Sequence, residues 1–157
     1  MVLRLSELLR YSLDAGRSER LPLSSELQVV CDYLELERLQ FEERLKWRID
    51  ISPEAQDATI PPMLLQQLVE NAVKHGIAPD PNGGEISIIG RIRSKQLELR
   101  VENTGQLIAS GKPADGLGLA NARERLRLLG GTKAVLSLEN KDERHVAATA
   151  AIPFEMA

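Results

Sequence analysis

The sequence predicts an α+β fold in which helices cover one face of a β-sheet, and three observations predict it. Apolar residues recur every three or four positions up to about residue 43, which is the helical period. From residue 45 the period changes to two, which is typical of a half-buried strand. The remaining segments follow the order β-α-β-β-loop-α-β-β, which fits one sheet with its helices on one side.

Two helices are expected first. Leucines at helical spacing predict a helix over residues 2–14, and the polar residues 15–22 form a connector. A second helix is predicted to begin near Ser24 or Ser25, whose hydroxyl would accept from a free amide of the first turn, and to end at about Glu43. Such a hairpin buries little apolar surface alone, so we expect it to pair with a second copy.

Strands and helices alternate after the hairpin. The first strand is predicted over residues 45–51, where apolar and charged side chains alternate. A helix opens at Pro61–Pro62 and runs to Lys74 or His75, where Gly76 ends it. The elements predicted beyond it are strands at 85–92, 96–102, 134–139 and 145–152, a long glycine-rich loop at 103–116 that suggests a lid, and a helix at 117–129.

Composition excludes several classes of protein. The 157 residues carry 20 basic and 23 acidic side chains, so there is no basic surplus for a dedicated nucleic-acid binder. One cysteine excludes a disulfide framework and a thiolate zinc site, and two histidines exclude a multi-histidine metal centre. No apolar run is long enough to span a bilayer and no signal peptide is visible, so we expect a cytoplasmic domain.

The helix of residues 64–75 is the most informative segment. Its polar side places a carboxylate, an amide oxygen, an ammonium and an imidazole within two turns: Glu70, Asn71, Lys74 and His75. These are the groups that hold a hydrated magnesium ion and a polyphosphate. The alternative is an ordinary amphipathic helix with a polar outer face.

Two further motifs follow. Gly116 and Gly118 stand directly before the last predicted helix, where glycine backbone and free amides suit an anion. Asn121 occupies the third glycine position of a dinucleotide fingerprint, which excludes that motif, and the alternative is a loop that closes on a helix. At residues 103–105 (NTG), Asn103 or Thr104 would form hydrogen bonds with the edge of a base. The alternative is that this segment is only the turn that follows a strand.

Jointly, these motifs resemble the ATP-binding domain shared by gyrase, Hsp90, histidine kinases and MutL. The asparagine-bearing box is residues 70–76 (ENAVKHG), and the two glycine boxes are residues 103–105 and 116–119. Further matching segments are 8–13 (LLRYSL), 33–37 (YLELE), 61–66 (PPMLLQ) and 118–126 (GLANARERL). Over nearly its whole length, the chain is similar to the LytS-type sensor histidine kinases.

The resemblance implies a fold, an organisation and an activity. The fold is a Bergerat-type two-layer sandwich with a mixed β-sheet. Residues 1–44 would be a truncated dimerisation and phosphotransfer hairpin, and residues 45–157 the catalytic domain. That domain would bind ATP and Mg²⁺ and transfer the γ-phosphoryl group to a histidine upstream of this chain, and thence to a response regulator.

The resemblance also implies residue roles. Asn71 would coordinate magnesium, Glu70 would polarise the attacking imidazole or position a metal-bound water, and Lys74 and His75 would contact phosphates. Asn103 would face the adenine amino group. The remaining binding positions are Thr104 and Gly105 at the base, and Gly116, Leu117, Gly118 and Leu119 in the lid.

Two departures from the family pattern matter. The family's acceptor histidine precedes the first residue of this chain, and neither His75 nor His145 replaces it, so the chain alone is expected not to autophosphorylate. Asn103 stands where many relatives carry aspartate, which removes a charge-assisted bond and weakens ATP binding by about 1 kcal/mol, unless the base contact has moved to Thr104.

Other readings remain open. One is a non-catalytic nucleotide-binding regulatory module, and another is a serine-directed kinase of the anti-sigma type, which the helical hairpin disfavours. The expected partners are a second copy in the full-length protein and a response regulator, such as one of the LytTR type, with no direct nucleic-acid contact. Membrane attachment, in the inner or plasma membrane, would come only through upstream segments.

Overall fold

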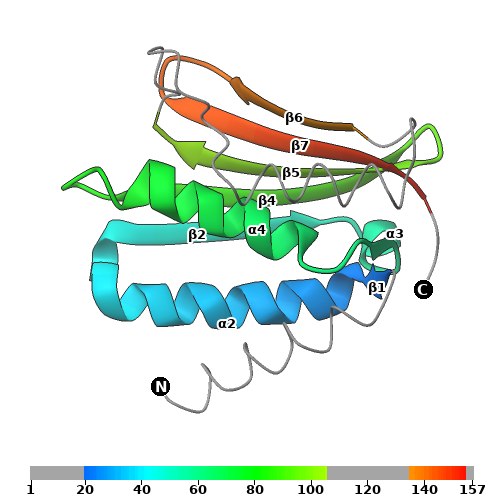
Figure 1. Cartoon of the computed structure of the whole chain (residues 1–157), viewed down its shortest axis with the longest axis horizontal. Helices are drawn as coiled ribbons and strands as arrows, with labels where there is room; N and C mark the ends of the chain where they lie inside the picture. The colour runs from blue at the N-terminus through cyan, green and yellow to red at the C-terminus, as the bar shows by residue number, and fades with distance from the viewer. Residues whose placement is uncertain (1–19, 106–134, 155–157) are drawn as a thin grey trace.

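The computed structural model of the chain describes residues 20–105 and 135–154 and shows a sheet with helices on one face (Figure 1). The strands of the main sheet are β2 (Leu45–Ile51), β4 (Gly84–Arg93), β5 (Gln96–Thr104), β6 (Val135–Asn140) and β7 (His145–Pro153). The helices are α2 (Leu23–Phe41), the short α3 (Pro53–Gln56) and α4 (Leu64–Ala72), with a 3₁₀ turn η1 (Glu42–Arg44) and a π-helical turn η2 (Val73–Ile77).

The main sheet is mixed, with strand order β2-β4-β5-β7-β6. β2 pairs parallel to β4, starting from Leu45 opposite Gly84, and the other neighbours pair antiparallel. A parallel pair requires a crossover connection, and α3, α4 and η2 supply it. The predicted α+β fold with a mixed sheet and helices on one face is confirmed.

The core lies between α4 and the inner face of the sheet. On α4, the predicted apolar side is confirmed: Leu64, Leu65, Leu68, Val69 and Ala72 are at most 2% exposed. They pack with fully buried residues of the sheet, namely Ile86, Ile88, Leu97 and Leu99. Burying one such side chain contributes roughly 1.5–3 kcal/mol, so this layer fixes where the polar side of α4 lies.

Helix α2 shares this core. Leu23, Val30, Leu34 and Phe41 belong to the same cluster as α4 and the sheet, so its partners include elements of its own chain. The first helix of the expected hairpin, residues 2–14, lies outside the described residues. The domain boundary at residues 44 and 45 stays a prediction.

α2 begins one residue before the predicted start at Ser24, and the predicted serine cap was wrong. Pro22, not a serine, precedes the first helical residue, and no side chain caps that end. A small sheet of β1 (Leu21–Pro22) and β3 (Thr59–Ile60) fixes the chain there, and Leu23 N donates to Ala58 O at 2.8 Å. Strands this short carry no periodic signal, so the sequence did not reveal them.

The ends of α4 also differ from the prediction. The helix begins at Leu64 rather than at the proline pair, because Met63 adopts a left-handed backbone with φ of 68°. Gly76 does not end the helical segment, since η2 runs through it to Ile77. A Cβ atom at Gly76 would lie 2.8 Å from Thr104 O, so the glycine is required for close packing rather than for a helix stop.

The remaining strand predictions hold, with one exception in burial. Leu45 is buried and Trp47 and Ile51 pack against the core, as alternation predicts, but Ile49 is 37% exposed. β2 is the edge strand of the sheet, which explains this exposure. The lid and the helix at 117–129 fall outside the described residues.

Candidate functional site

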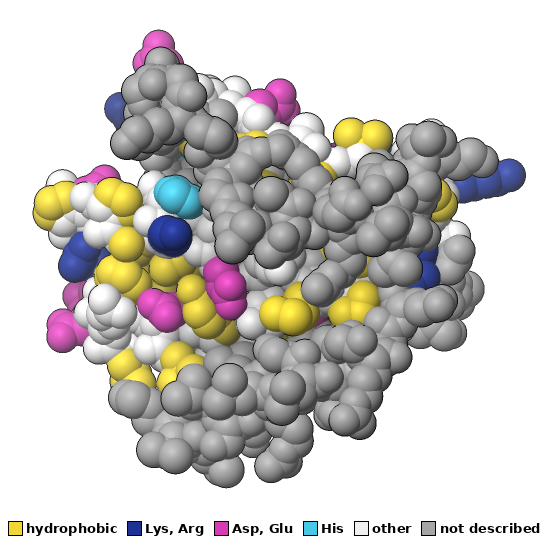
Figure 2. Space-filling view, in the orientation of Figure 1, with side chains coloured by type: hydrophobic (Ala, Val, Ile, Leu, Met, Phe, Trp, Pro, Cys, Tyr) yellow, Lys and Arg dark blue, Asp and Glu magenta, His cyan; other side chains and the backbone are white. Residues whose placement is uncertain are grey.

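Three predicted site residues lie together at the C-terminal end of α4 and in η2. Asn71 is half-buried, and Lys74 and His75 are exposed. Within residues 20–105 and 135–154, the side chains of these three residues have no hydrogen-bond or ion-pair partner. Figure 2 shows histidine and basic side chains over this end of α4, with acidic side chains closer to α2. The three side chains are therefore available to a ligand.

A π-helical turn carries two of these residues. Ala78 N donates to Val73 O at 2.9 Å, five residues back, which widens the turn that holds Lys74 and His75. Single π-turns within helices occur frequently at functional sites. The sequence prediction of a regular helix up to a glycine stop missed this turn.

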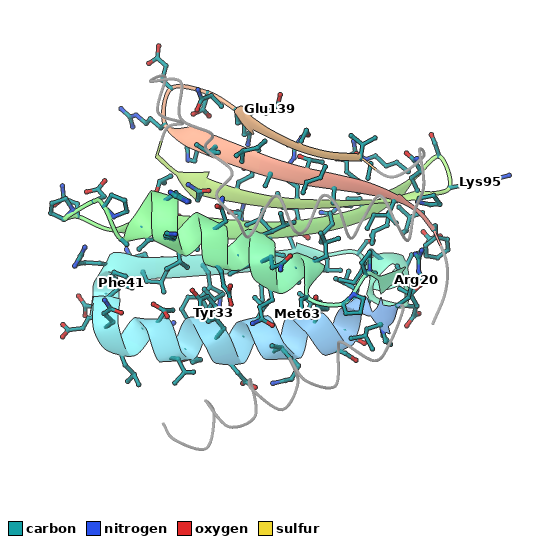
Figure 3. All side chains as sticks on the ribbon, in the orientation of Figure 1. Arg20, Tyr33, Phe41, Met63, Lys95 and Glu139 are labelled. Carbon is teal, nitrogen blue, oxygen red and sulfur yellow. The ribbon has the colours of Figure 1, made fainter. Side chains whose placement is uncertain are left out.

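Glu70 faces α2. Its charge raises the pKa of Glu37, where burial is the larger cause, and it also adds to the raised pKa of Tyr33, which burial dominates. Figure 3 shows Tyr33 in the space between α2 and α4. Glu70 is therefore oriented toward the α2 side of α4.

Gln66 is a site neighbour that the sequence analysis did not identify. It is 6% exposed, and its Nε2 donates to Glu70 Oε1 at 3.0 Å, while its own buried Oε1 has no hydrogen-bond partner in the structure. The signal was available, because residues four positions apart lie on the same side of a helix. The bond occupies one carboxylate oxygen of Glu70 and leaves the other for a ligand.

The imidazole of His75 favours its neutral form. Partial burial, and secondarily the charge of Lys74, lower the pKa of His75 below its ordinary value of 6.5. A neutral imidazole both donates and accepts hydrogen bonds. An anion bound beside His75 and Lys74 would favour the protonated form instead.

The asparagine box and the first glycine box meet in space. Gly76 lies against the Asn103 carboxamide, so closely that a Cβ atom there would overlap Nδ2 and stand 2.8 Å from Cγ. Gly105, whose φ of 125° favours glycine, lies beside both groups: a Cβ there would be 3.7 Å from Nδ2 and 3.6 Å from Gly76 Cα. Two motifs that are distant in the sequence thus form one junction.

Thr104 is already engaged at this junction. Its Oγ1 accepts from Glu85 N at 3.2 Å, and Gly84 packs so closely on the hydroxyl that a Cβ there would overlap it. Asn103 is 7% exposed, and its Nδ2 donates to Thr104 O at 2.9 Å. Both side chains are thus hydrogen-bonded at this junction, and the choice between Asn103 and Thr104 as the residue that faces a base stays a prediction. The predicted positions Gly116, Leu117, Gly118 and Leu119 are outside the described residues.

Magnesium would depend on few protein ligands. Among the described residues, no group of three or more histidine, cysteine, aspartate or glutamate side chains is placed to hold a metal ion. Mg²⁺ commonly takes one or two protein oxygens together with phosphates and waters. The free amide oxygen of Asn71 fits that donor set.

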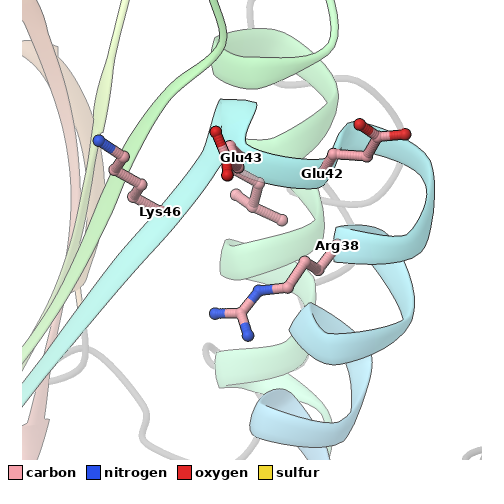
Figure 4. Close-up of a pocket in the computed structure, with 5 residues that line it drawn as sticks. Arg38, Glu42, Glu43 and Lys46 are labelled. Atoms are coloured by element: carbon pink, nitrogen blue, oxygen red, sulfur yellow. The ribbon is translucent and has the colours of Figure 1, made fainter.

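A separate pocket lies at the turn between α2 and β2 (Figure 4). It is lined by Arg38, Glu42, Glu43, Leu45 and Lys46. The lining includes two acidic and two basic side chains, and Arg38 also stacks over Trp47 at 4.2 Å. None of the predicted site residues lines this pocket.

No helix in the described part of the chain has the length and apolar content needed to cross a membrane.

The mixed sheet and its helical layer form an α+β domain in which the asparagine box and the first glycine box meet. Residues 56–156 match the family described as histidine kinase-, DNA gyrase B-, and HSP90-like ATPase, and residues 1–45 match the histidine kinase family. The chain belongs to the histidine kinase-, DNA gyrase B- and HSP90-like ATPase family, whose nucleotide is ATP.

Known proteins support this assignment. The chain is 30% identical over 156 residues to Sensor protein LytS of Staphylococcus epidermidis, with 89% of this chain and 26% of LytS aligned. It therefore spans about a quarter of the length of the curated relatives that it matches. The catalytic domain of histidine kinase ThkA has the same fold, with a TM-score of 0.66, 19% identity, and coverage of 85% of this chain and 93% of that domain. The expected resemblance to LytS-type kinases is confirmed.

Proposed function

We propose that the chain is the ATP-binding catalytic domain of a sensor histidine kinase, and that it transfers the γ-phosphoryl group of ATP to a histidine outside this chain. The observation that carries this proposal is the contact between Gly76 and Asn103, which joins the two boxes into one site. The side chains of Asn71, Lys74 and His75, which have no partner within residues 20–105 and 135–154, lie next to that junction on α4 and η2.

The α4–η2 end of the site would bind the phosphates. Asn71 would give its amide oxygen to Mg²⁺, while Lys74 and His75 would contact phosphate oxygens. Magnesium, when bound, neutralises charge on the transferring phosphoryl group. The exposure of Lys74 and His75, and the half-buried amide of Asn71, support these roles.

Glu70 would act on the incoming imidazole. Gln66 occupies Oε1, so the second carboxylate oxygen would accept the imidazole N–H. As the imidazole nitrogen bonds to the γ-phosphorus, the bond to the β–γ bridging oxygen breaks, ADP leaves, and the imidazole proton passes to Glu70. The residues of the second glycine box, Gly116–Leu119, would close over the triphosphate.

Partners and location belong to the same proposal. We expect a homodimer in the full-length protein and phosphotransfer to a response regulator, such as one of the LytTR type. Histidine kinase ThkA has been solved in complex with response regulator protein TrrA. The matching chain of that complex has the same fold, with a TM-score of 0.64 and 17% identity, and the alignment covers 98% of this chain and 48% of that chain. The domain would work in the cytoplasm, attached to a membrane through segments outside this chain.

Calorimetry tests nucleotide binding. Titrating the 157-residue chain with ATP and Mg²⁺ should give binding heat, and Asn71→Ala should weaken the affinity at least tenfold, because a metal ligand is lost. Asn82→Ala, at an exposed asparagine in the loop before β4, is the matched control and should not change affinity. Undetectable heat in the parent chain, or equal affinity in Asn71→Ala, would contradict the proposal.

Phosphotransfer needs its own test, because the acceptor lies elsewhere. A longer protein that includes this chain and its upstream histidine-bearing helix should form phosphohistidine with labelled ATP, and Glu70→Gln should slow the reaction. ATP binding without phosphohistidine would favour the non-catalytic regulatory module instead.

A further inference from the structure

The carboxamide of Asn103 is held at its NH₂ end. Nδ2 donates to the backbone oxygen of Thr104 at 2.9 Å, and it packs closely against Gly76, with Gly105 near both. Crowding on the Gly76 side is severe, because a Cβ atom there would overlap Nδ2. The side chain is nearly buried, at 7% exposure, so water competes little for these positions.

This contact fixes which end of the amide faces outward. A carboxamide has a donor end and an acceptor end, whereas the Thr104 carbonyl only accepts. A half-turn of the Asn103 amide would break the bond to Thr104 and place two acceptor oxygens against each other. No described residue donates to Asn103 Oδ1, so this oxygen is the free end.

We propose that the close contact with Gly76 and the bond to Thr104 O hold the Asn103 carboxamide in one orientation, and that this orientation makes the site select a purine with a 6-amino group over one with a 6-oxo group. Gly76 is then a positioning residue for base recognition, although it belongs to the box that serves the phosphates. The inference rests on the proposed function and adds a determinant of base specificity.

A neutral amide does not by itself favour a 6-amino purine over a 6-oxo purine. A carboxylate only accepts hydrogen bonds, so it favours an amino group without further help. An amide that is free to turn would accept from a 6-amino group or donate to a 6-oxo group, and would discriminate poorly. Here donation to a 6-oxo group requires breaking the bond to Thr104 O.

A comparison of ATP with inosine triphosphate tests the orientation, because the two differ at position 6 of the base. In the parent chain, with Mg²⁺ present, we expect ATP to bind at least about tenfold more tightly, which corresponds to one hydrogen bond lost and one repulsion gained. In Gly76→Ala the added Cβ displaces Nδ2 from Thr104 O, and the ratio should fall to within about threefold.

Gly90→Ala is the matched control. This glycine on β4 is also crowded, since a Cβ there would lie 2.9 Å from Ile51 Cδ1, but it is not at the junction. The terminal methyl group of Ile51 can move aside, so the control variant should fold and keep the ratio of the two affinities. Equal binding of both nucleotides by the parent chain, or an unchanged ratio in folded Gly76→Ala, would overturn the inference.

A measurement on the parent chain covers the case in which Gly76→Ala does not fold. In the ¹⁵N-labelled chain, the Asn103 NH₂ protons should show nuclear Overhauser effects to the Gly76 Hα protons, with and without ATP. Loss of these effects on ATP binding would show that the amide turns, and would contradict the inference. Failure of both nucleotides to bind would instead contradict the proposed function.

Discussion

The two ends of the candidate site differ in how many of their polar groups are already paired. At the β5 end, Asn103 and Thr104 are hydrogen-bonded to backbone groups and packed against glycines. At the α4–η2 end, Asn71, Lys74 and His75 have no partners within the described residues. Under the proposed function, the base-facing end would be formed before a ligand arrives, whereas the phosphate-facing end would gain its polar contacts from the ligand.

The largest difference between the two ends should appear in stability. Asn103→Ala removes a buried side chain and leaves Thr104 O without its donor, so we expect a loss of about 2 kcal/mol in the free energy of unfolding. Asn71→Ala removes an amide that has no described partner, and should change that free energy by less than about 0.5 kcal/mol. Urea denaturation of both variants measures the free energy of unfolding, and equal losses in the two variants would contradict the difference between the two ends.

The strand that carries Asn103 should owe part of its rigidity to Glu102. This buried carboxylate contacts Arg100 Nη1 at 3.3 Å and Lys141 Nζ at 2.9 Å. We expect Glu102→Ala to cost about 1–2 kcal/mol of stability, moderated because both cations are partly exposed and can be hydrated. Asp50→Ala, which breaks an exposed pair with Arg91, is the control and should cost at most about 0.5 kcal/mol.

The same comparison shows what the sequence could and could not predict. The sequence predicted the apolar side of α4 and the strands, because the spacing of apolar residues can be seen from neighbouring positions alone. Leu65 on α4 and Leu99 on β5 follow that spacing, and both are buried. The role of Gly76 was not, because its close contact with Asn103 depends on how η2 packs against β5. In the sequence, Gly76 follows the polar residues at the end of a predicted helix, and a glycine there is equally consistent with a helix stop.

Residue types were easier to predict than residue surroundings. Asn71, Lys74 and His75 were placed on one polar side from spacing alone, and the structure brings them together. The left-handed Met63, the π-turn and the buried Gln66 depend on tertiary packing that overrides local preference. The roles assigned to the site residues stay predictions.

Lys74 should contribute electrostatically and modestly. Because it is exposed and faces no described acid, we expect Lys74→Ala to weaken Mg-ATP binding by about 1 kcal/mol at low salt and by less at high salt. Calorimetric titrations at two ionic strengths measure this. A loss that does not depend on salt would indicate that Lys74 acts through structure rather than charge.

The smallest expected effect is the change in stability with pH that arises from His75. Its lowered pKa means that the folded chain binds fewer protons than the unfolded chain just below pH 6.5, so this group makes stability rise with pH across that window. Bound phosphates should raise the pKa of His75, which NMR titration of its Hε1 proton would detect. If Mg-ATP leaves the pKa of His75 unchanged, His75 does not contact the phosphates.

Chemical-shift mapping with Mg-ATP is the most direct measurement. Backbone amides of Asn71, Lys74, His75 and Asn103 are predicted to shift together with one binding constant, while amides lining the pocket of Arg38 and Lys46 stay unchanged. Shifts confined to that pocket, or shifts at Asn71 without any at Asn103, would contradict a single nucleotide site formed by both ends.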